Sequence, residues 1–206
     1  MTPGPRWVFD SEDARSLLDE KKAYLELALS EIRLTQEVRT ALDTGCGVGH
    51  FYGFLADLGL DVTAIDVRVT NIEEARRRHP HLHFMQADLE DPPSGVPEAD
   101  LVLCFGLLYH LENPFRSIRN LFRLTAKTLL IESLVSCHDH PAAWLVDECD
   151  QADQGLHQLA FIPSEPCLVK MLYRAGFPYV YRAAQSPDHA TFRNDLLSRS
   201  RRTLLA

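Results

Sequence analysis

The residues with the clearest chemical potential follow a short apolar run over residues 38–42. Asp43 ends this run, and three glycines follow at alternate positions, Gly45, Gly47 and Gly49. Glycine lets the backbone adopt positive φ and approach a ligand closely, and the N–H groups at the start of a helix can then face that ligand. The stretch therefore predicts a ligand-binding loop between a buried strand and a helix.

The spacing of the glycines separates two kinds of ligand. The dinucleotide fingerprint G-x-G-x-x-G requires a glycine where this chain has His50. A carboxylate at Asp43 suits a cationic ligand, because it can receive an ammonium group directly or through water, whereas it would repel a pyrophosphate. A glycine turn in another kind of α/β protein is the alternative interpretation of this loop taken alone.

Two further acids follow the next two predicted strands. Asp66 closes the run 62–65, and Asp88 follows the run 83–87. An acid about twenty residues beyond such a glycine loop can accept hydrogen bonds from both hydroxyls of a ribose. Capping of the turn that follows is the alternative role for Asp66, and the two roles can coexist.

A third group of candidates follows residues 100–105, an apolar run typical of a central parallel strand. Ligands of doubly wound folds bind at the carboxyl ends of the strands, so we expect Phe105 to His110 beside the reacting group. His110 is the best candidate for a catalytic base, because imidazole titrates near neutral pH. Tyr109 could contact the ligand or the substrate. Packing or hydrogen bonding is the alternative role for both residues.

The elements that must position these residues alternate between strand and helix with short loops. This alternation predicts an α/β domain with a parallel sheet covered by helices on both faces. Asp10 or Ser11 is the expected N-cap of the first helix. We expect helices over 10–36, 51–58, 71–78, 114–124 and 164–176, and strands over 38–42, 62–65, 83–87, 100–105, 128–132, 178–182 and 201–206.

The D-x-G-x-G-x-G pattern, Asp66, Asp88 and the segment after the fourth strand resemble, in this order, the class I S-adenosylmethionine-dependent methyltransferases. The resemblance implies a Rossmann-like, doubly wound sheet of seven strands in the order 3-2-1-4-5-7-6, with the last strand antiparallel. It also implies S-adenosylmethionine as cofactor, S-adenosylhomocysteine as product, and an adenine that meets Asp88 and the N–H of Leu89. The implied cofactor-binding residues are Asp43, Gly45, Cys46, Gly47, Gly49, Asp66, Val67, Asp88, Leu89 and Phe105.

A narrower resemblance links CFGLLYHLENP, residues 129–132 and FIPSEPCLVKMLYRAGF to the branch that transfers a carboxymethyl group to the wobble uridine of tRNA. That branch normally carries an extra N-terminal region, whereas only residues 1–9 precede the first predicted helix here. We therefore expect a methyltransferase for oxygen or nitrogen of a small molecule. The alternatives are an RNA-modifying transferase, with Arg76–Arg78 and Arg199–Arg202 contacting phosphates, and a cofactor-binding regulatory protein without turnover.

Composition bounds these hypotheses. The 206 residues suffice for one domain, and the net charge of −8 argues against a broad nucleic-acid surface. No apolar run approaches the roughly 20 residues that a membrane span requires. The five cysteines lack CxxC spacing, so reduced thiols in a cytoplasmic protein are expected. Cys104 is expected to be a small buried hydrophobe, and the chain could continue beyond Ala206.

The remaining expectations concern residues outside the main motifs. Residues 134–162, which are rich in His, Asp and Cys, predict a solvated, mobile substrate lid rather than a metal site. Arg76–Arg78 predict a solvated helix end. Lys21 and Lys22 are expected off the apolar stripe of the first helix, and Trp7 or Tyr24 could touch the cofactor, although a core position is favoured.

Overall fold

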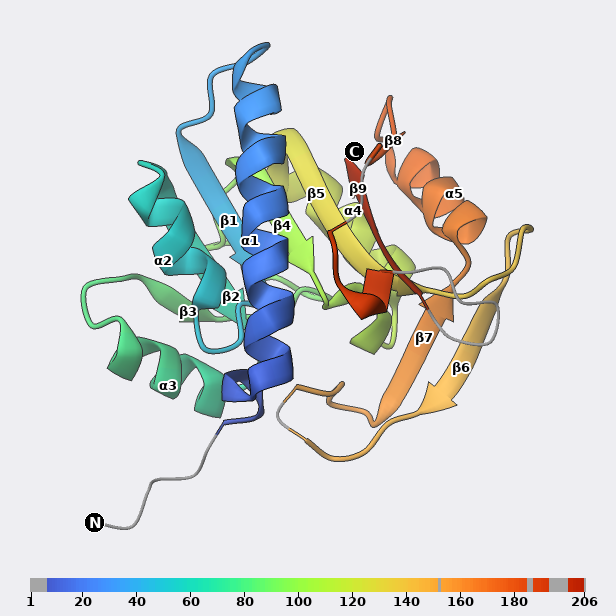
Figure 1. The fold of residues 1–206 in the computed structure, drawn as a ribbon, viewed down its shortest axis with the longest axis horizontal. Helices are drawn as coiled ribbons and strands as arrows, with labels where there is room; N and C mark the ends of the chain where they lie inside the picture. The colour runs from blue at the N-terminus through green and yellow to red at the C-terminus, as the bar shows by residue number, and fades with distance from the viewer. Residues whose placement is uncertain (1–6, 152, 185–186, 193–199, 206) are drawn as a thin grey trace.

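The computed structural model describes residues 7–151, 153–184, 187–192 and 200–205, and its centre is a seven-stranded sheet (Figure 1). The strand order is β3-β2-β1-β4-β5-β9-β8; β1 to β5 are parallel, and β9 is antiparallel to β5 and β8. Counted within this sheet, the order is the predicted 3-2-1-4-5-7-6. The strands are β1 (Thr40–Thr44), β2 (Asp61–Asp66), β3 (Phe84–Gln86), β4 (Ala99–Phe105), β5 (Thr125–Val135), β8 (Tyr181–Arg182) and β9 (Ser200–Leu205).

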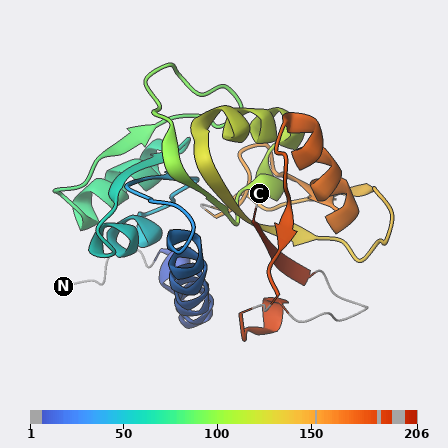
Figure 2. The same ribbon diagram turned by 90° about the horizontal axis from the view of Figure 1, so that it is seen from above.

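Helices cover both faces of the sheet, as Figure 2 shows from above. Successive strand residues point to opposite faces, which creates two cores. Ala41 and Ala64 pack in the core beneath α1, α2 and α3, while their neighbours Leu42 and Ile65 pack in the core beneath α4 and α5. This arrangement confirms the Rossmann-like α/β class. The helices are α1 (Glu12–Arg33), α2 (His50–Asp57), α3 (Val69–Arg78), α4 (Pro114–Leu124) and α5 (Glu165–Ala175), with short 3₁₀ turns η1 (Val8–Asp10), η2 (Leu108–His110) and η3 (Ala190–Phe192).

Two serine caps begin helices close to the predicted positions. The Oγ of Ser11 accepts the N–H of Ala14 at 3.2 Å, so Ser11 rather than Asp10 is the N-cap of α1. The Oγ of Ser164 accepts the N–H of Cys167 at 3.2 Å and donates to the carbonyl of His140 at 2.7 Å. Ser164 therefore starts α5 and also fixes the loop that leads into β6 (Ala143–Asp147).

The region 134–162 differs from the predicted solvated segment. Strand β5 runs on to Val135, and β6 pairs antiparallel with β7 (Leu159–Pro163) in a separate two-stranded sheet (Figure 1). Residues 161–163, which directly precede the helix predicted over 164–176, belong to β7. The pairing of β6 with β7 joins the backbone N–H and C=O groups of two segments that are separate in the sequence. A hydrophobic pattern over the length of one strand does not reveal such a partner.

The start of β5 also corrects the sequence analysis. β5 begins three residues before the strand predicted over 128–132, and α4 passes directly into β5 at Thr125. Thr125 pairs with Ala99 before a register shift, and Lys127 forms an ion pair with Asp100 at 2.8 Å. A glycine turn is unnecessary because Thr125 already has extended backbone angles, φ −99° and ψ 110°.

None of the helices in the described part of the chain combines the length and the apolar character that crossing a membrane would need.

Candidate functional site

A cavity of about 320 Å³ opens at the carboxyl ends of the parallel strands, where the chain order reverses between β1 and β4. This volume lies in the range of small-molecule sites, and the position is where doubly wound sheets bind ligands. Ten predicted residues line it, and only Asp43 and Gly49 of the predicted set do not. The ten are Gly45, Cys46, Gly47, Asp66, Val67, Asp88, Leu89, Phe105, Tyr109 and His110.

The glycine loop forms one wall of the cavity. Gly47 has φ +53°, and a Cβ there would lie 3.5 Å from the ring of Phe9. Gly49 has φ +87° and is the N-cap of α2, but its missing Cβ makes room for Phe84 at 2.8 Å. Gly47 thus serves the cavity, whereas Gly49 serves the packing behind it.

Asp66 joins the glycine loop to the second strand. Its Oδ2 accepts the N–H of Gly47 at 2.9 Å, and its Oδ1 accepts the N–H of Arg68 at 2.8 Å and the side-chain amide of Asn71 at 3.3 Å. Burial raises the pKa of this carboxyl, and the hydrogen bonds from Arg68 and Gly47 oppose that rise. Asp66 therefore caps the following turn, as one expectation stated, while its carboxylate also lines the cavity.

Asp43 lies beneath the glycine loop, not on the cavity wall. It belongs to β1 itself, is 2% exposed, and its Oδ2 lacks a hydrogen-bond partner among the described residues. Burial, with a smaller contribution from Asp66, raises the pKa of Asp43 to about 8. A buried polar atom without a partner is costly, so the carboxyl is suited to a ligand or water that would satisfy it.

The residues after β3 form another part of the wall. Asp88 is exposed, and its Oδ1 accepts the N–H of Glu90 at 2.8 Å. Leu89 is 4% exposed, and its carbonyl accepts the side-chain amide of Asn120 at 2.9 Å. The loop after β3 is therefore fixed by local hydrogen bonds at the place where the sequence analysis expected an adenine.

The N-terminal segment roofs the cavity. Trp7 and Tyr24, which could have touched the cofactor but for which a core position was favoured, do not line the cavity. Tyr24 packs against the core, and burial raises its pKa to about 12. The lining residues from this segment are Phe9, Ala14, Leu17, Leu18 and Lys21.

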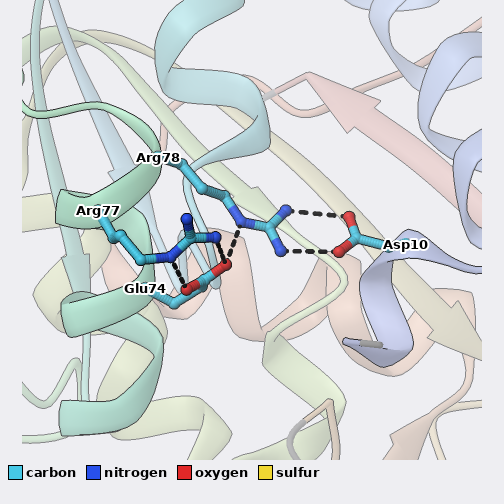
Figure 3. A network of polar contacts seen from close by, with 4 residues as sticks. All are labelled: Asp10, Glu74, Arg77 and Arg78. Atoms are coloured by element: carbon cyan, nitrogen blue, oxygen red, sulfur yellow. Dashed lines mark hydrogen bonds and ion pairs between the residues drawn. The ribbon is translucent and has the colours of Figure 1, made fainter. Parts of the chain in front are cut away.

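An ion-pair network fastens this roof to α3 (Figure 3). Nη1 and Nη2 of Arg78 donate to Asp10, at 2.9 and 2.7 Å, and Nε of Arg78 donates to Glu74 at 2.7 Å. Arg77 shares Glu74, and Arg76 donates to the carbonyl of Phe84 at 2.8 Å. The prediction of a solvated arginine run is therefore wrong for Arg78, whose guanidinium group is committed to partners in the domain, whereas Arg76 and Arg77 are exposed.

A buried ion pair that the sequence analysis missed lies between α1 and β5. Lys21 is 8% exposed, lines the cavity and donates from Nζ to Glu132 at 2.7 Å, and Glu132 is fully buried. Lys21 was expected off the apolar stripe, but its spacing of four residues from Leu17 and from Leu25 places it on that stripe. The spacing could have revealed the position of Lys21, while the acidic partner, 111 residues away, could not be found from local sequence.

His110 and Tyr109 lie together just after the carboxyl end of β4. Their ring centroids are 4.1 Å apart, and both residues line the cavity. Nδ1 of His110 is 2.8 Å from Oε1 of Glu148, a residue of the predicted lid. Cys104, which lies within β4, is fully buried in the core beneath α4, and burial raises its pKa to about 12. Both observations agree with its predicted role as a buried hydrophobe.

The region predicted as a lid contributes a further wall. Its cavity-lining residues are Asp153, Gln154, Gly155, Leu156 and His157. The side chains of this region that could bind a metal do not gather at one point. Within the described residues, no three His, Cys, Asp or Glu side chains converge as metal ligands would.

Comparison with known proteins gives the family context. Residues 42–128 match a family model described as a methyltransferase domain. The malonyl-[acyl-carrier protein] O-methyltransferase of Enterobacter lignolyticus (strain SCF1) is 32% identical over 127 residues, which cover 58% of this chain and 49% of that protein. The tRNA U34 carboxymethyltransferase of Edwardsiella ictaluri (strain 93-146) is 27% identical over 158 residues, which cover 72% of this chain and 48% of that protein. This chain therefore spans about half the length of these curated relatives.

A solved structure shares the fold over nearly the whole chain. It is the N-terminal domain of EvdMO1 with S-adenosylhomocysteine bound, with a TM-score of 0.75 and 20% sequence identity. The match covers 95% of this chain and 84% of that one.

Proposed function

We propose that this chain transfers a methyl group from S-adenosylmethionine to an oxygen or nitrogen atom of a small molecule, because residues 42–128 match a methyltransferase domain. The observation that carries the proposal is the alignment of the glycine loop, Asp66 and Asp88 around one cavity at the strand ends. A regulatory protein without turnover would need the cofactor wall alone, whereas this cavity also includes Tyr109 and His110.

The donor set fits a nucleoside that carries a cationic amino acid. Asp66 lines the cavity and would receive ribose hydroxyls, while Asp88 and Leu89 would meet the adenine. Asp43 would receive the methionine ammonium, directly or through water, because its buried Oδ2 has no other partner in the described residues. Gly45, Cys46, Gly47, Val67 and Phe105 would complete the cofactor wall, and Gly49 would support it from behind.

When bound, S-adenosylmethionine supplies the electrophilic methyl group and its leaving group. The chain must then align the acceptor, exclude water and remove a proton. His110 is the residue that we assign to proton removal, with the ring of Tyr109 beside it. The roof formed by Phe9, Leu17 and Leu18 and the wall formed by residues 153–157 exclude water from two sides.

A tRNA acceptor is the second candidate because a tRNA U34 carboxymethyltransferase is among the relatives. Of the arginines expected to contact phosphates, Arg78 is bound to Asp10 and Glu74. Arg76 donates to the carbonyl of Phe84, and Arg77 shares Glu74. The rest of the proposed phosphate-binding set, Arg199–Arg202, lies where side chains are outside the described residues. A small-molecule acceptor therefore agrees better with the net charge of −8.

The test combines binding with turnover. Calorimetry should detect S-adenosylmethionine binding, and Asp66→Asn should weaken it by about 1.5–3 kcal/mol, the size of charge-assisted hydrogen bonds. Release of S-adenosylhomocysteine should then be screened with phenols, amines, carboxylic acids, malonyl-acyl carrier protein and unmodified tRNA. His110→Ala should lower turnover about 10²–10⁴-fold with cofactor affinity nearly unchanged.

Unchanged affinity in a folded Asp66→Asn protein would refute the cofactor assignment. Turnover on tRNA that falls steeply with salt, without turnover on the small molecules, would favour the RNA-modifying alternative.

A further inference from the structure

We infer that Glu148 is a positioning residue that fixes the tautomer and orientation of His110 for proton removal from the acceptor. The inference rests on the proposed function. It assigns a role to a side chain of the predicted lid, a region whose sequence pattern suggested only a mobile cover.

The geometry of the pair supports this role. Oε1 of Glu148 is 2.8 Å from Nδ1 of His110, Oε2 is 2.9 Å from the same nitrogen, and the two side chains are 8% and 11% exposed. A carboxylate only accepts hydrogen bonds, so Nδ1 must carry the proton in this contact. In the neutral ring the lone pair is then on Nε2, which makes Nε2 the proton acceptor, as in other carboxylate–histidine pairs.

Glu148 is itself held in place by the turn that follows it. Its Oε2 accepts the N–H of Gly155 at 2.9 Å, and its own N–H donates to the carbonyl of Gln158 at 2.8 Å. A Cβ on Gly155 would lie 2.6 Å from the carbonyl oxygen of His110, so the close approach of this turn to His110 requires glycine. The carboxylate therefore reaches His110 from a fixed direction.

Arg68 links the same turn to the cofactor wall. Its Nη2 donates to the carbonyls of Gln154 and Gly155 at 3.0 and 3.4 Å, while its N–H binds Asp66. The hydrogen-bond chain from Asp66 through Arg68, Gly155 and Glu148 to His110 thus joins the two assigned functions of the cavity. A pair that served only to hold the lid would not need to end on the ring that faces the cavity.

The proton transfer needs only the acceptor, His110, Glu148 and water. The proton leaves the O–H or N–H of the acceptor for Nε2 of His110, and the Nδ1–H remains hydrogen-bonded to Glu148. The negative carboxylate stabilises the imidazolium that forms, which then releases its proton to water.

Other charged and titratable groups line the same cavity. They lie on α1, α2, β2, the β2–α3 connection, the loop after β3 and the lid itself. They are Lys21, His50, Asp66, Arg68, Asp88, Glu90, Asp153 and His157. Glu148 differs from these groups in its direct hydrogen bond to the ring, so its removal should have a specific effect on His110.

The test compares Glu148→Gln with Glu112→Gln by ¹⁵N NMR of the histidine rings, in the free protein and with S-adenosylhomocysteine. Glu112 is a matched control because its ion pair with His157, at 3.4 Å, lies at an exposed site. We expect a Nδ1–H tautomer for His110 in the wild type. In Glu148→Gln, its titration should move down by about one pH unit and both tautomers should appear, whereas Glu112→Gln should leave His110 unchanged.

The inference would be overturned if the neutral ring of His110 in the wild type carried its proton on Nε2. It would also be overturned if Glu148→Gln left the titration of His110 unchanged. S-adenosylhomocysteine affinity should stay within about twofold in both variants, because neither side chain is assigned to the cofactor. For acceptors that turn over, Glu148→Gln should lower kcat about 10–100-fold and move the acidic limb of the rate profile to lower pH. Failure to bind S-adenosylhomocysteine would refute the proposed function alone, since the ring signals report the pair in the free protein.

Discussion

The cavity has two sides that are built in different ways. On the strand side, the glycine loop and Asp66, with Asp43 beneath the loop, are positioned by backbone hydrogen bonds of parallel strands that are buried on both faces. On the cover side, η1 and the turn after β6 are held by side-chain contacts, chiefly Arg78 with Asp10 and Glu148 with His110. The strand side belongs to the core, whereas the cover is attached to it by a few ionic contacts.

This difference separates two kinds of mutational effect. Changes on the strand side remove groups that a bound cofactor would meet, so they should alter affinity directly. Changes in the cover remove contacts that close the cavity, and the free energy of such partly exposed ion pairs is small. The cover should therefore set rates of entry and release more than the identity of the ligand.

The largest effect is expected on the strand side, at Gly47. Valine at φ +53° is strained by about 1–3 kcal/mol, and its side chain would enter the cavity between the loop and Phe9. We expect Gly47→Val to weaken S-adenosylmethionine binding about 100-fold or more in calorimetry, with the circular dichroism of the fold retained. Gly95→Val is the control, because a Cβ there meets only Met85, at 3.9 Å. Normal binding by Gly47→Val would place the cofactor elsewhere.

The strand side is also the part that the sequence predicts well. Short apolar runs that end in an acid, at Asp43, Asp66 and Asp88, predict where the first three strands end, and parallel strands bring those ends together. Asp43 is the exception in detail: it was expected just beyond the strand, but β1 continues through Asp43 to Thr44. Thr44 donates from its hydroxyl to the carbonyl of Leu103 at 2.7 Å, which keeps this polar end of the strand inside the sheet.

The cover could be predicted only as an insertion. Its fixed points pair residues that are far apart in sequence, such as Asp10 with Arg78 and Arg68 with Gln154. No local periodicity encodes such contacts, so Arg78 looked like a solvated helix end and Glu148 like one member of a polar lid. Gly155 carried the one readable signal, a glycine within a polar stretch, which in the structure marks the close approach to His110.

A second, smaller effect on the strand side concerns the pH dependence of binding. Burial raises the pKa of Asp43 to about 8, so below pH 8 the carboxyl is mostly neutral in the free protein. An ammonium group favours the ionised form, so binding should release a proton and affinity should rise about tenfold from pH 6.5 to pH 8, then level off. Calorimetry in buffers of different ionisation enthalpy measures this proton release.

Asp43→Asn is the matching variant, since it keeps the shape of the side chain and removes the titration. It should bind more weakly at pH 8 and show a nearly flat profile between pH 6.5 and pH 8. The effect on folding has the opposite sign: a carboxyl whose pKa is raised in the folded state lowers stability progressively as pH rises from about 4 to about 8. A wild-type affinity that falls over this pH range would exclude Asp43 as the ammonium partner.

The smallest effect is expected in the cover, where Arg78 and Arg77 form a natural pair of test and control. Both contact Glu74, but only Arg78 reaches Asp10, next to Phe9 above Gly47 (Figure 3). Arg78→Gln should weaken S-adenosylhomocysteine binding by about 1 kcal/mol, because the Arg78–Asp10 pair is bidentate and only partly exposed. Stopped-flow measurement should show this loss as a faster dissociation rate. The Arg77 side chain is 72% exposed, so Arg77→Gln should leave the association and dissociation rates unchanged. Equal effects of the two variants would mean that the network stabilises α3 and not the roof, and the contrast between the two sides of the cavity would then rest on the lid alone.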